Sequence, residues 1–188
     1  MLRHLKNLIK GEKSAAIAVI SIDNDVNTPS YLLNYECFSL AWNEQHKGCF
    51  IDPFNGCLIE YHNPKDWIFF SSSEEYSTNV FWGYEKDGTI KRSDLFQNIN
   101  NSKKSNIESG RIDVNIDEML HDLIETGFDE TLGGYDMGIT SYSILIYDSI
   151  NDEYRRNILK TEGDKHITSR SSFAPELLNY FGNHIITE

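Results

Sequence analysis

The sequence predicts an α+β fold in which a mainly antiparallel sheet carries about three helices. Three observations lead to this prediction. Short β-branched and aromatic segments separated by turn residues run through residues 14–91. Two helical patterns follow in the second half of the chain, and a pair of strand patterns lies between them. There is no internal repeat, and the 188 residues suit one domain, residues 1–188.

The N-terminal half is predicted to start with a short amphipathic helix and a buried strand. Leucine and isoleucine residues share one helical face over residues 2–10, and residues 14–22 are small, β-branched and apolar. Residues 31–42 are rich in aromatic side chains and fit a strand or a helix equally well. We therefore expect the residues that follow this segment to form the first hairpin of the sheet.

Two hairpins are predicted in the middle of the chain. The first joins residues 49–51 to residues 57–61, because Asn55-Gly56 between them is a strong turn signal. The second joins residues 80–84 to residues 89–91 through a turn ending in Asp87-Gly88. Another strand is predicted over residues 67–70.

Residues 98–110 are polar and rich in Asn and Ser, which predicts a surface loop between a strand-rich N-terminal part and an acidic C-terminal part. The elements predicted after this loop are a helix at 116–127, a strand at 139–147, its hairpin partner at 154–159 and a last helix at 172–181. Pro175 near the start of the last helix and Gly182 just beyond its end fit the usual helix boundaries.

The composition excludes several classes of function. The chain holds 29 acidic residues against 17 Lys and Arg, for a net charge of −12. This balance argues against a nucleic-acid partner, which requires a basic surface, and against an anionic membrane surface. No run of about 20 apolar residues is present to span a membrane. Cys37, Cys49 and Cys57 have no CxxC spacing, which favours free, buried thiols in a reducing cytoplasm.

The acidity is concentrated in one segment. Residues 112–154 hold eleven acids and no Lys or Arg, whereas the other 145 residues hold 18 acids and 17 bases. In the predicted helix within this segment, one face carries Ile116, Leu120, Leu123 and Ile124. The opposite face carries Glu118, Asp122 and Glu125, although like charges at such spacing destabilise a helix and acids are unfavourable near its C-terminal end. Breaking a local rule without visible compensation is typical of a functional surface.

Three interpretations of the acidic segment remain open at this point. The basic residues that follow it can fold back and neutralise it: Arg155, Arg156, Lys160, Lys165 and Arg170. The segment can instead present a docking surface for a basic protein. A metal site is the third interpretation, since Asp113, Asn115 and Asp117 match the opening of a calcium loop. However, the loop requires Gly at its sixth position and Glu at its twelfth, where this chain has Glu118 and Ile124, so no metal is predicted.

No catalytic signature occurs in the sequence. The chain has no HExxH, no GxSxG and no phosphate-binding glycine loop, and its six histidines show no metal-ligand spacing. We therefore predict no catalytic residues, no enzyme activity and no cofactor.

This profile of a small, acidic, cysteine-poor α+β chain without catalytic motifs resembles the immunity proteins of bacterial toxin systems, especially those of contact-dependent growth inhibition. The resemblance covers composition and the charge layout of residues 112–154, and no diagnostic motif. It implies a cytoplasmic inhibitor that binds a cognate toxin domain, often a basic nuclease, and blocks its active site.

We therefore expect a partner-binding surface centred on residues 113–136. Its predicted contact residues are Asp113, Asp117, Glu118, Asp122, Glu125, Asp129, Glu130, Tyr135 and Asp136. Tyr135 fits an apolar anchor of this surface or a core position equally well. Two alternatives remain: a small enzyme or ligand-binding domain with a pocket in the aromatic-rich N-terminal half, and an adaptor for a basic protein other than a toxin.

Overall fold

The computed structural model describes residues 28–39, 45–62, 87–107, 115–132, 138–163 and 165–185. The predicted helix at 2–10 and the predicted strands at 14–22, 67–70 and 80–84 lie outside these residues. Their predictions therefore stay predictions.

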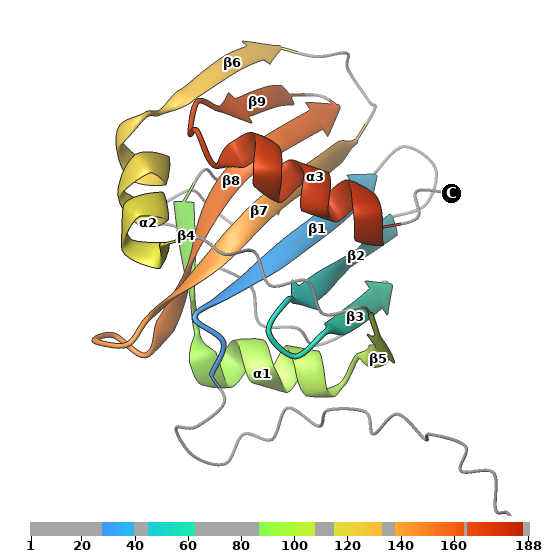
Figure 1. Ribbon diagram of the computed structural model, residues 1–188. Coiled ribbons are helices and arrows are strands. Elements are labelled where there is room, and N and C mark those ends of the chain that lie inside the picture. The colour runs from blue at the N-terminus through green and yellow to red at the C-terminus, as the bar shows by residue number, and fades with distance from the viewer. Residues whose placement is uncertain are drawn as a thin grey trace, which may run out of the picture.

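One antiparallel sheet of nine strands forms the centre of the structure (Figure 1). Its strands are β1 (Tyr31–Ser39), β2 (Gln45–Asp52), β3 (Cys57–His62), β4 (Asp87–Lys91), β5 (Lys103–Asn106), β6 (Phe128–Leu132), β7 (Ile139–Asp148), β8 (Glu153–Gly163) and β9 (Lys165–Ser169). The order across the sheet is β5-β3-β2-β1-β7-β8-β9-β6, and β4 also pairs with β8. With the three helices described below, this confirms the predicted α+β class.

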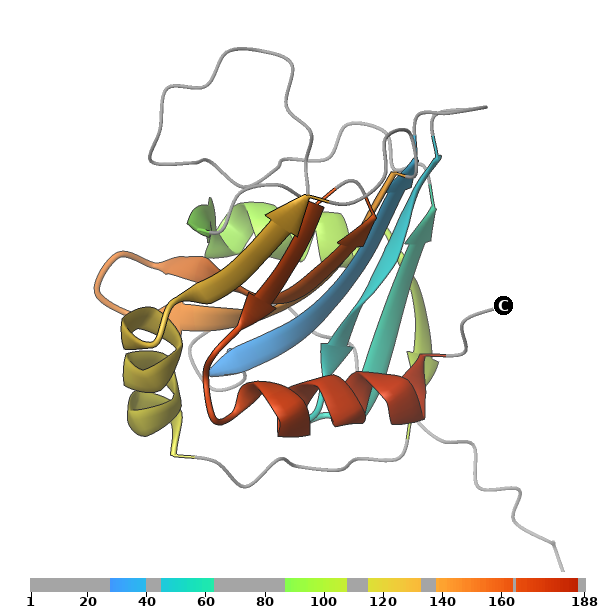
Figure 2. The same cartoon turned by 90° about the horizontal axis from the view of Figure 1, so that it is seen from above.

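Helices cover both faces of the sheet. Figures 1 and 2 show α3 (Ala174–His184) lying across one face and α1 (Arg92–Asn100) on the opposite face. The remaining helix, α2 (Ile116–Glu125), stands at the side of the sheet and leads directly into β6.

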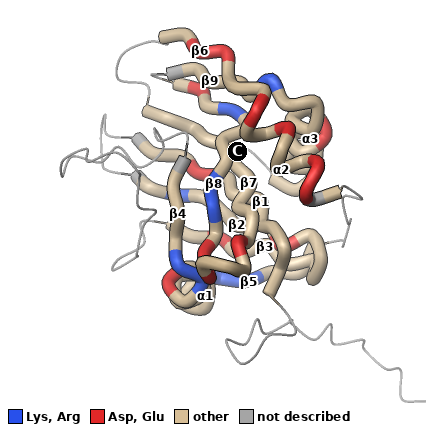
Figure 3. Tube along the Cα trace, turned by 90° about the vertical axis from the view of Figure 1, so that its left-hand side faces the viewer, with Lys and Arg blue, Asp and Glu red and all other residues tan. Residues whose placement is uncertain are grey.

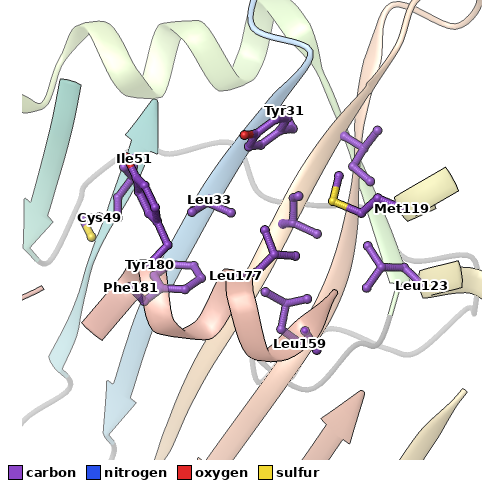
Figure 4. Close-up of a cluster of buried hydrophobic side chains, with 13 residues drawn as sticks. Tyr31, Leu33, Cys49, Ile51, Met119, Leu123, Leu159, Leu177, Tyr180 and Phe181 are labelled. Atoms are coloured by element: carbon purple, nitrogen blue, oxygen red, sulfur yellow. The ribbon is translucent and has the colours of Figure 1, made fainter. Parts of the chain in front are cut away.

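The larger core lies beneath α3 and α2. Because side chains alternate along a strand, β1 sends Tyr31 and Leu33 into this core and Leu32 into the second core beneath α1. Figure 4 shows Met119 and Leu123 of α2 reaching the same cluster as the α3 side chains. The inner face of α2 is therefore fixed by apolar packing, which leaves its outer face for other roles.

The hairpins predicted from Asn55-Gly56 and from the strand patterns at 139–159 are both present. Asp52 pairs with Cys57 across the first turn, and Gly56 adopts the positive φ of 59° that its turn requires. The carboxylate of Asp52 accepts hydrogen bonds from the backbone amides of Phe54 at 3.0 Å and Asn55 at 3.1 Å. In the second hairpin, β7 pairs with β8 along its whole length.

The predicted helices at 116–127 and 172–181 are also confirmed, as α2 and α3. One detail of the α2 prediction is wrong. Ile124, assigned to the core face, is 55% exposed, whereas Met119 is fully buried. The core face is therefore rotated towards Met119 and Leu123, and Ile124 lies at its outer margin.

The prediction of a loop at 98–110 is wrong for the residues that the structure describes. Residues 98–100 end α1, and residues 103–106 form β5, which pairs with β3 at the edge of the sheet. Leu95, Phe96 and Ile99 hold α1 on the second core. The polar residues at 97, 98 and 100 conceal this apolar face in the sequence.

The sequence pattern also does not predict β6 and β9. Both are short strands, and β6 has a mostly exposed surface, so neither shows the alternation of a half-buried strand. Their pairing places the acidic residues that follow α2 on the last strand of the sheet order.

Candidate functional site

The acidic side chains of α2 are placed by an ordinary helix start. The side chain of Asn115 accepts hydrogen bonds from the backbone amides of Asp117 at 3.1 Å and Glu118 at 3.4 Å, which caps the helix. Asp117 and Glu118 occupy the first turn, where the helix dipole favours negative charge. Both side chains are exposed. Within the described part of the chain, neither forms an ion pair.

Asp122 has a structural role that the sequence does not predict. Its Oδ2 accepts hydrogen bonds from the Ser171 hydroxyl at 2.6 Å and from the backbone amide of Ser172 at 2.8 Å. These bonds connect α2 to the segment that enters α3, and the bond from Ser171 lowers the pKa of Asp122 below its ordinary value. The sequence suggests that nothing offsets the unfavourable charge of Asp122 near the end of the helix. This expectation is wrong, because the hydrogen bonds from Ser171 and Ser172 stabilise the carboxylate.

Glu125, the third acid of the outer face, is open to solvent. Its carboxylate lies 3.6 Å from His121 one turn earlier, and the two side chains are 66% and 74% exposed. A contact of this kind between exposed side chains contributes little to stability. Beside Glu125 stands the exposed Ile124, so α2 presents an apolar side chain among acids.

The acids of β6 extend this charge along the sheet edge. Asp129 forms an ion pair with Arg170, whose Nε donates to Oδ1 at 2.8 Å, and this hydrogen bond lowers the pKa of Asp129. Glu130 on the same strand is exposed. Figure 3 shows the acidic segments of α2 and β6. Asp113, Tyr135 and Asp136, which were predicted to belong to the same surface, lie outside the described residues.

The basic residues that follow the acidic segment neutralise it only in part. Arg170 pairs with Asp129, as described above, but Arg156 points into the sheet and Lys160 pairs with Glu162 at 2.6 Å. At the other end of the segment, Asp152 and Glu153 pair with Arg92 and Lys91 respectively. Among the described residues, the acids of α2 form no ion pair with these Lys and Arg side chains.

A second polar cluster lies inside the sheet. Glu36, His46 and Arg156 are all less than 9% exposed. One carboxylate oxygen of Glu36 lies 2.6 Å from His46 Nε2, and the other accepts a hydrogen bond from Arg156 Nη2 at 3.0 Å. Arg156 also donates to the hydroxyl of Ser141 at 2.9 Å and to that of Ser143 at 3.3 Å. The cluster connects β1, β2, β7 and β8 through hydrogen bonds made by the Glu36 carboxylate and the Arg156 guanidinium.

The electrostatics of this cluster follow from its burial. Burial would raise the pKa of Glu36, but the Arg156 guanidinium and the His46 ring outweigh it and hold that pKa below its ordinary value. Burial likewise raises the pKa of the neighbouring Tyr61 phenol. Glu36 is therefore a carboxylate at neutral pH, and its partners satisfy both of its oxygens. The sequence gives only a weak signal of this cluster, namely single charged residues within apolar strand patterns.

The expected thiols are present, and a metal site is not found. Cys37, Cys49 and Cys57 are free, and the latter two are buried. In the described ranges, no group of three or more His, Cys, Asp or Glu side chains is arranged to hold a metal ion. Among the described residues, no helix combines the length and the apolar character needed to cross a membrane.

Comparison with protein-family models, curated proteins and solved structures finds no match to this chain.

Proposed function

We propose that this chain is a protein inhibitor without chemistry of its own, which binds and neutralises a cognate basic toxin domain of the nuclease class in the cytoplasm. The observation that carries this proposal is the outer face of α2. It presents the exposed acids Asp117, Glu118 and Glu125 on the same helix as the exposed Ile124, while Asp122 and Asp129 are held by partners from the segment before α3.

The physical reason begins with the partner. A nuclease has a basic groove that holds phosphates, and an inhibitor must reach this groove in competition with nucleic acid. Negative charge gathered on one face raises the rate of association with such a groove by roughly 10- to 1000-fold, and salt removes much of this advantage.

Affinity requires more than charge. Exposed charge pairs contribute little free energy, whereas an apolar side chain buried at the centre of an interface contributes much more. Ile124 is suited to this role because it is 55% exposed and directly precedes the exposed Glu125 on the helix.

The test is affinity capture with the full chain from cells that produce it, at low and at high salt. We expect a basic protein that is toxic when expressed alone and harmless when co-expressed with this chain. Glu118→Lys with Glu125→Lys should slow association at least tenfold at low salt and change it little at high salt.

Glu176→Lys provides the matched control, because Glu176 is an exposed acid in the first turn of α3 rather than on α2. Equal association rates for the α2 variant and the unmodified chain would overturn the proposed surface. A captured partner that is not toxic would overturn the inhibitory function.

A further inference from the structure

The tip of the β7–β8 hairpin is held in one conformation by its own side chains. The carboxylate of Asp148 accepts hydrogen bonds from the backbone amides of Ile150 at 2.9 Å and Asn151 at 3.3 Å. Its second oxygen accepts a bond from the side-chain amide of Asn151 at 2.9 Å. The four residues of the turn, 149–152, therefore have little conformational freedom left to lose on binding.

The start of α1 braces the same turn from the side. Arg92 donates from Nε to the carboxylate of Asp152 at 2.6 Å and from its backbone amide to the Asp152 carbonyl at 3.1 Å. The Tyr147 hydroxyl donates to the same carboxylate at 2.8 Å, and Lys91 donates to the Asn151 carbonyl at 3.1 Å. These bonds hold Asp152 at a φ of 51°, which is an unfavourable backbone conformation for a residue other than glycine.

The side chain presented by this braced turn is apolar. Ile150 is 92% exposed. Isolated apolar side chains are common on protein surfaces, but turns favour Gly, Asn, Asp, Ser and Pro. Hydrogen bonds fix Asn151, Asp152 and the backbone of Ile150. The turn therefore holds the isoleucine side chain in water in a fixed position.

The hairpin tip and α2 lie at the same end of the molecule. Figures 1 and 2, which view the molecule from directions 90° apart, both show the β7–β8 turn and α2 at the left-hand end. A partner that covers this end can therefore contact both the braced turn and the helix that carries the acidic surface.

We propose that Ile150 inserts into an apolar pocket of the same basic protein that α2 attracts, so that the hairpin supplies an anchor and α2 supplies the charge. This inference rests on the proposed function. Charge argues against a second copy of this chain as the occupant, because a symmetric dimer places the same patch of both copies in contact. The acids of two α2 helices would then approach each other.

The first experiment places a photo-crosslinking amino acid, p-benzoylphenylalanine, at one position of the full chain in the cells that produce it. The positions are Ile150, Glu118 and Leu132. Leu132 is the matched control because it is also exposed, at 85%, but stands at the end of β6 furthest from α2. We expect crosslinks to the same basic protein from positions 150 and 118, and none from position 132.

The second experiment measures the affinity of that protein for Ile150→Ser and Leu132→Ser. If Ile150 is buried in the complex, Ile150→Ser removes that buried apolar side chain and should raise Kd by about 10- to 100-fold. Leu132→Ser should stay within about twofold. Both substitutions lie at exposed positions, so thermal unfolding of either variant should match that of the unmodified chain.

The possible failures are distinguishable. A crosslink from position 118 but not from position 150, or an unchanged Kd for Ile150→Ser, would overturn the anchor and leave the proposed function intact. A crosslink from position 150 to a second copy of this chain would also overturn the anchor. A toxic partner crosslinked from position 150, whose association does not respond to charge reversal on α2, would overturn the acidic surface and support the anchor. The absence of any crosslink from both positions would overturn both proposals.

Discussion

The carboxylates of Glu36 and of Glu118 belong to the same chain but have opposite surroundings. Glu36 of β1 is buried, and its two carboxylate oxygens contact His46 of β2 and Arg156 of β8. Glu118 is exposed on α2 and has no ion-pair partner within the described residues. The comparison separates acids that the fold requires from acids that it tolerates.

Asp122 shows that this distinction is made residue by residue. It stands on the same helix as Glu118 and Glu125, but it accepts hydrogen bonds from Ser171 and Ser172 and so connects α2 to α3. An acidic patch seen in a sequence can therefore contain both structural and unengaged carboxylates. Only the unengaged ones are available to a partner at no cost to the fold.

The largest effect is expected from removing one member of the buried cluster. Arg156→Met leaves the Glu36 carboxylate in the interior without its main counter-charge, which typically costs about 3–5 kcal/mol of unfolding free energy. Urea unfolding followed by circular dichroism measures this loss. The double variant Glu36→Leu with Arg156→Met should recover most of the stability, because it removes both charges. A loss below about 1 kcal/mol in the single variant would show that the cluster is not needed for the fold.

A smaller effect is expected from acid. The pKa of Glu36 is held below its ordinary value of 4.5, so its contribution to stability is fully present above that pH. That contribution is lost as the pH falls through the lowered folded-state pKa. The unfolding free energy should therefore fall more steeply below pH 4.5 in the unmodified chain than in Glu36→Gln. Asp122 and Asp129, whose pKa values are also lowered, titrate in both proteins and cancel in this difference. Parallel pH profiles would contradict the assignment.

The smallest effect on stability is expected from charge reversal on α2. Glu118→Lys with Glu125→Lys should change the unfolding free energy by less than about 0.5 kcal/mol, as is usual for exposed positions. Asp122→Ala on the same helix should lower the unfolding midpoint and speed hydrogen exchange at the backbone amide of Ser172, because that amide loses its acceptor. If the two variants unfolded alike, the distinction between structural and unengaged acids on α2 would be wrong.

The elements predicted correctly are those whose apolar pattern reflects their own packing. β7 has a strongly apolar centre at 144–146, α2 has Leu120 and Leu123 on one face, and the first hairpin has Asn55-Gly56 in its turn. In each case neighbouring residues in the sequence carry the signal.

The elements that were missed depend on residues distant in the sequence. β5 and β6 are short, polar strands at the two ends of the sheet order, where backbone pairing with β3 and β9 decides the structure. The buried cluster joins Glu36 to Arg156 across 120 positions of the chain. One sequence contains no information that pairs these two residues. For the same reason, the bond from Ser171 to Asp122 could not be foreseen from the charges of α2.

The order of strands also determines when the acidic region can be completed during synthesis. β6 precedes β9 in the chain, but it joins the sheet through β9. Arg170, the partner of Asp129, is likewise synthesised after α2 and β6. The same holds for the serine partners of Asp122. A ribosome that has joined residues up to 160 has therefore synthesised every described acid of α2 and β6 but none of these partners. The surface formed by α2 and β6 therefore reaches its final form only after residues 165–172 have emerged, and a chain cut at residue 160 would leave Asp122 and Asp129 without these partners.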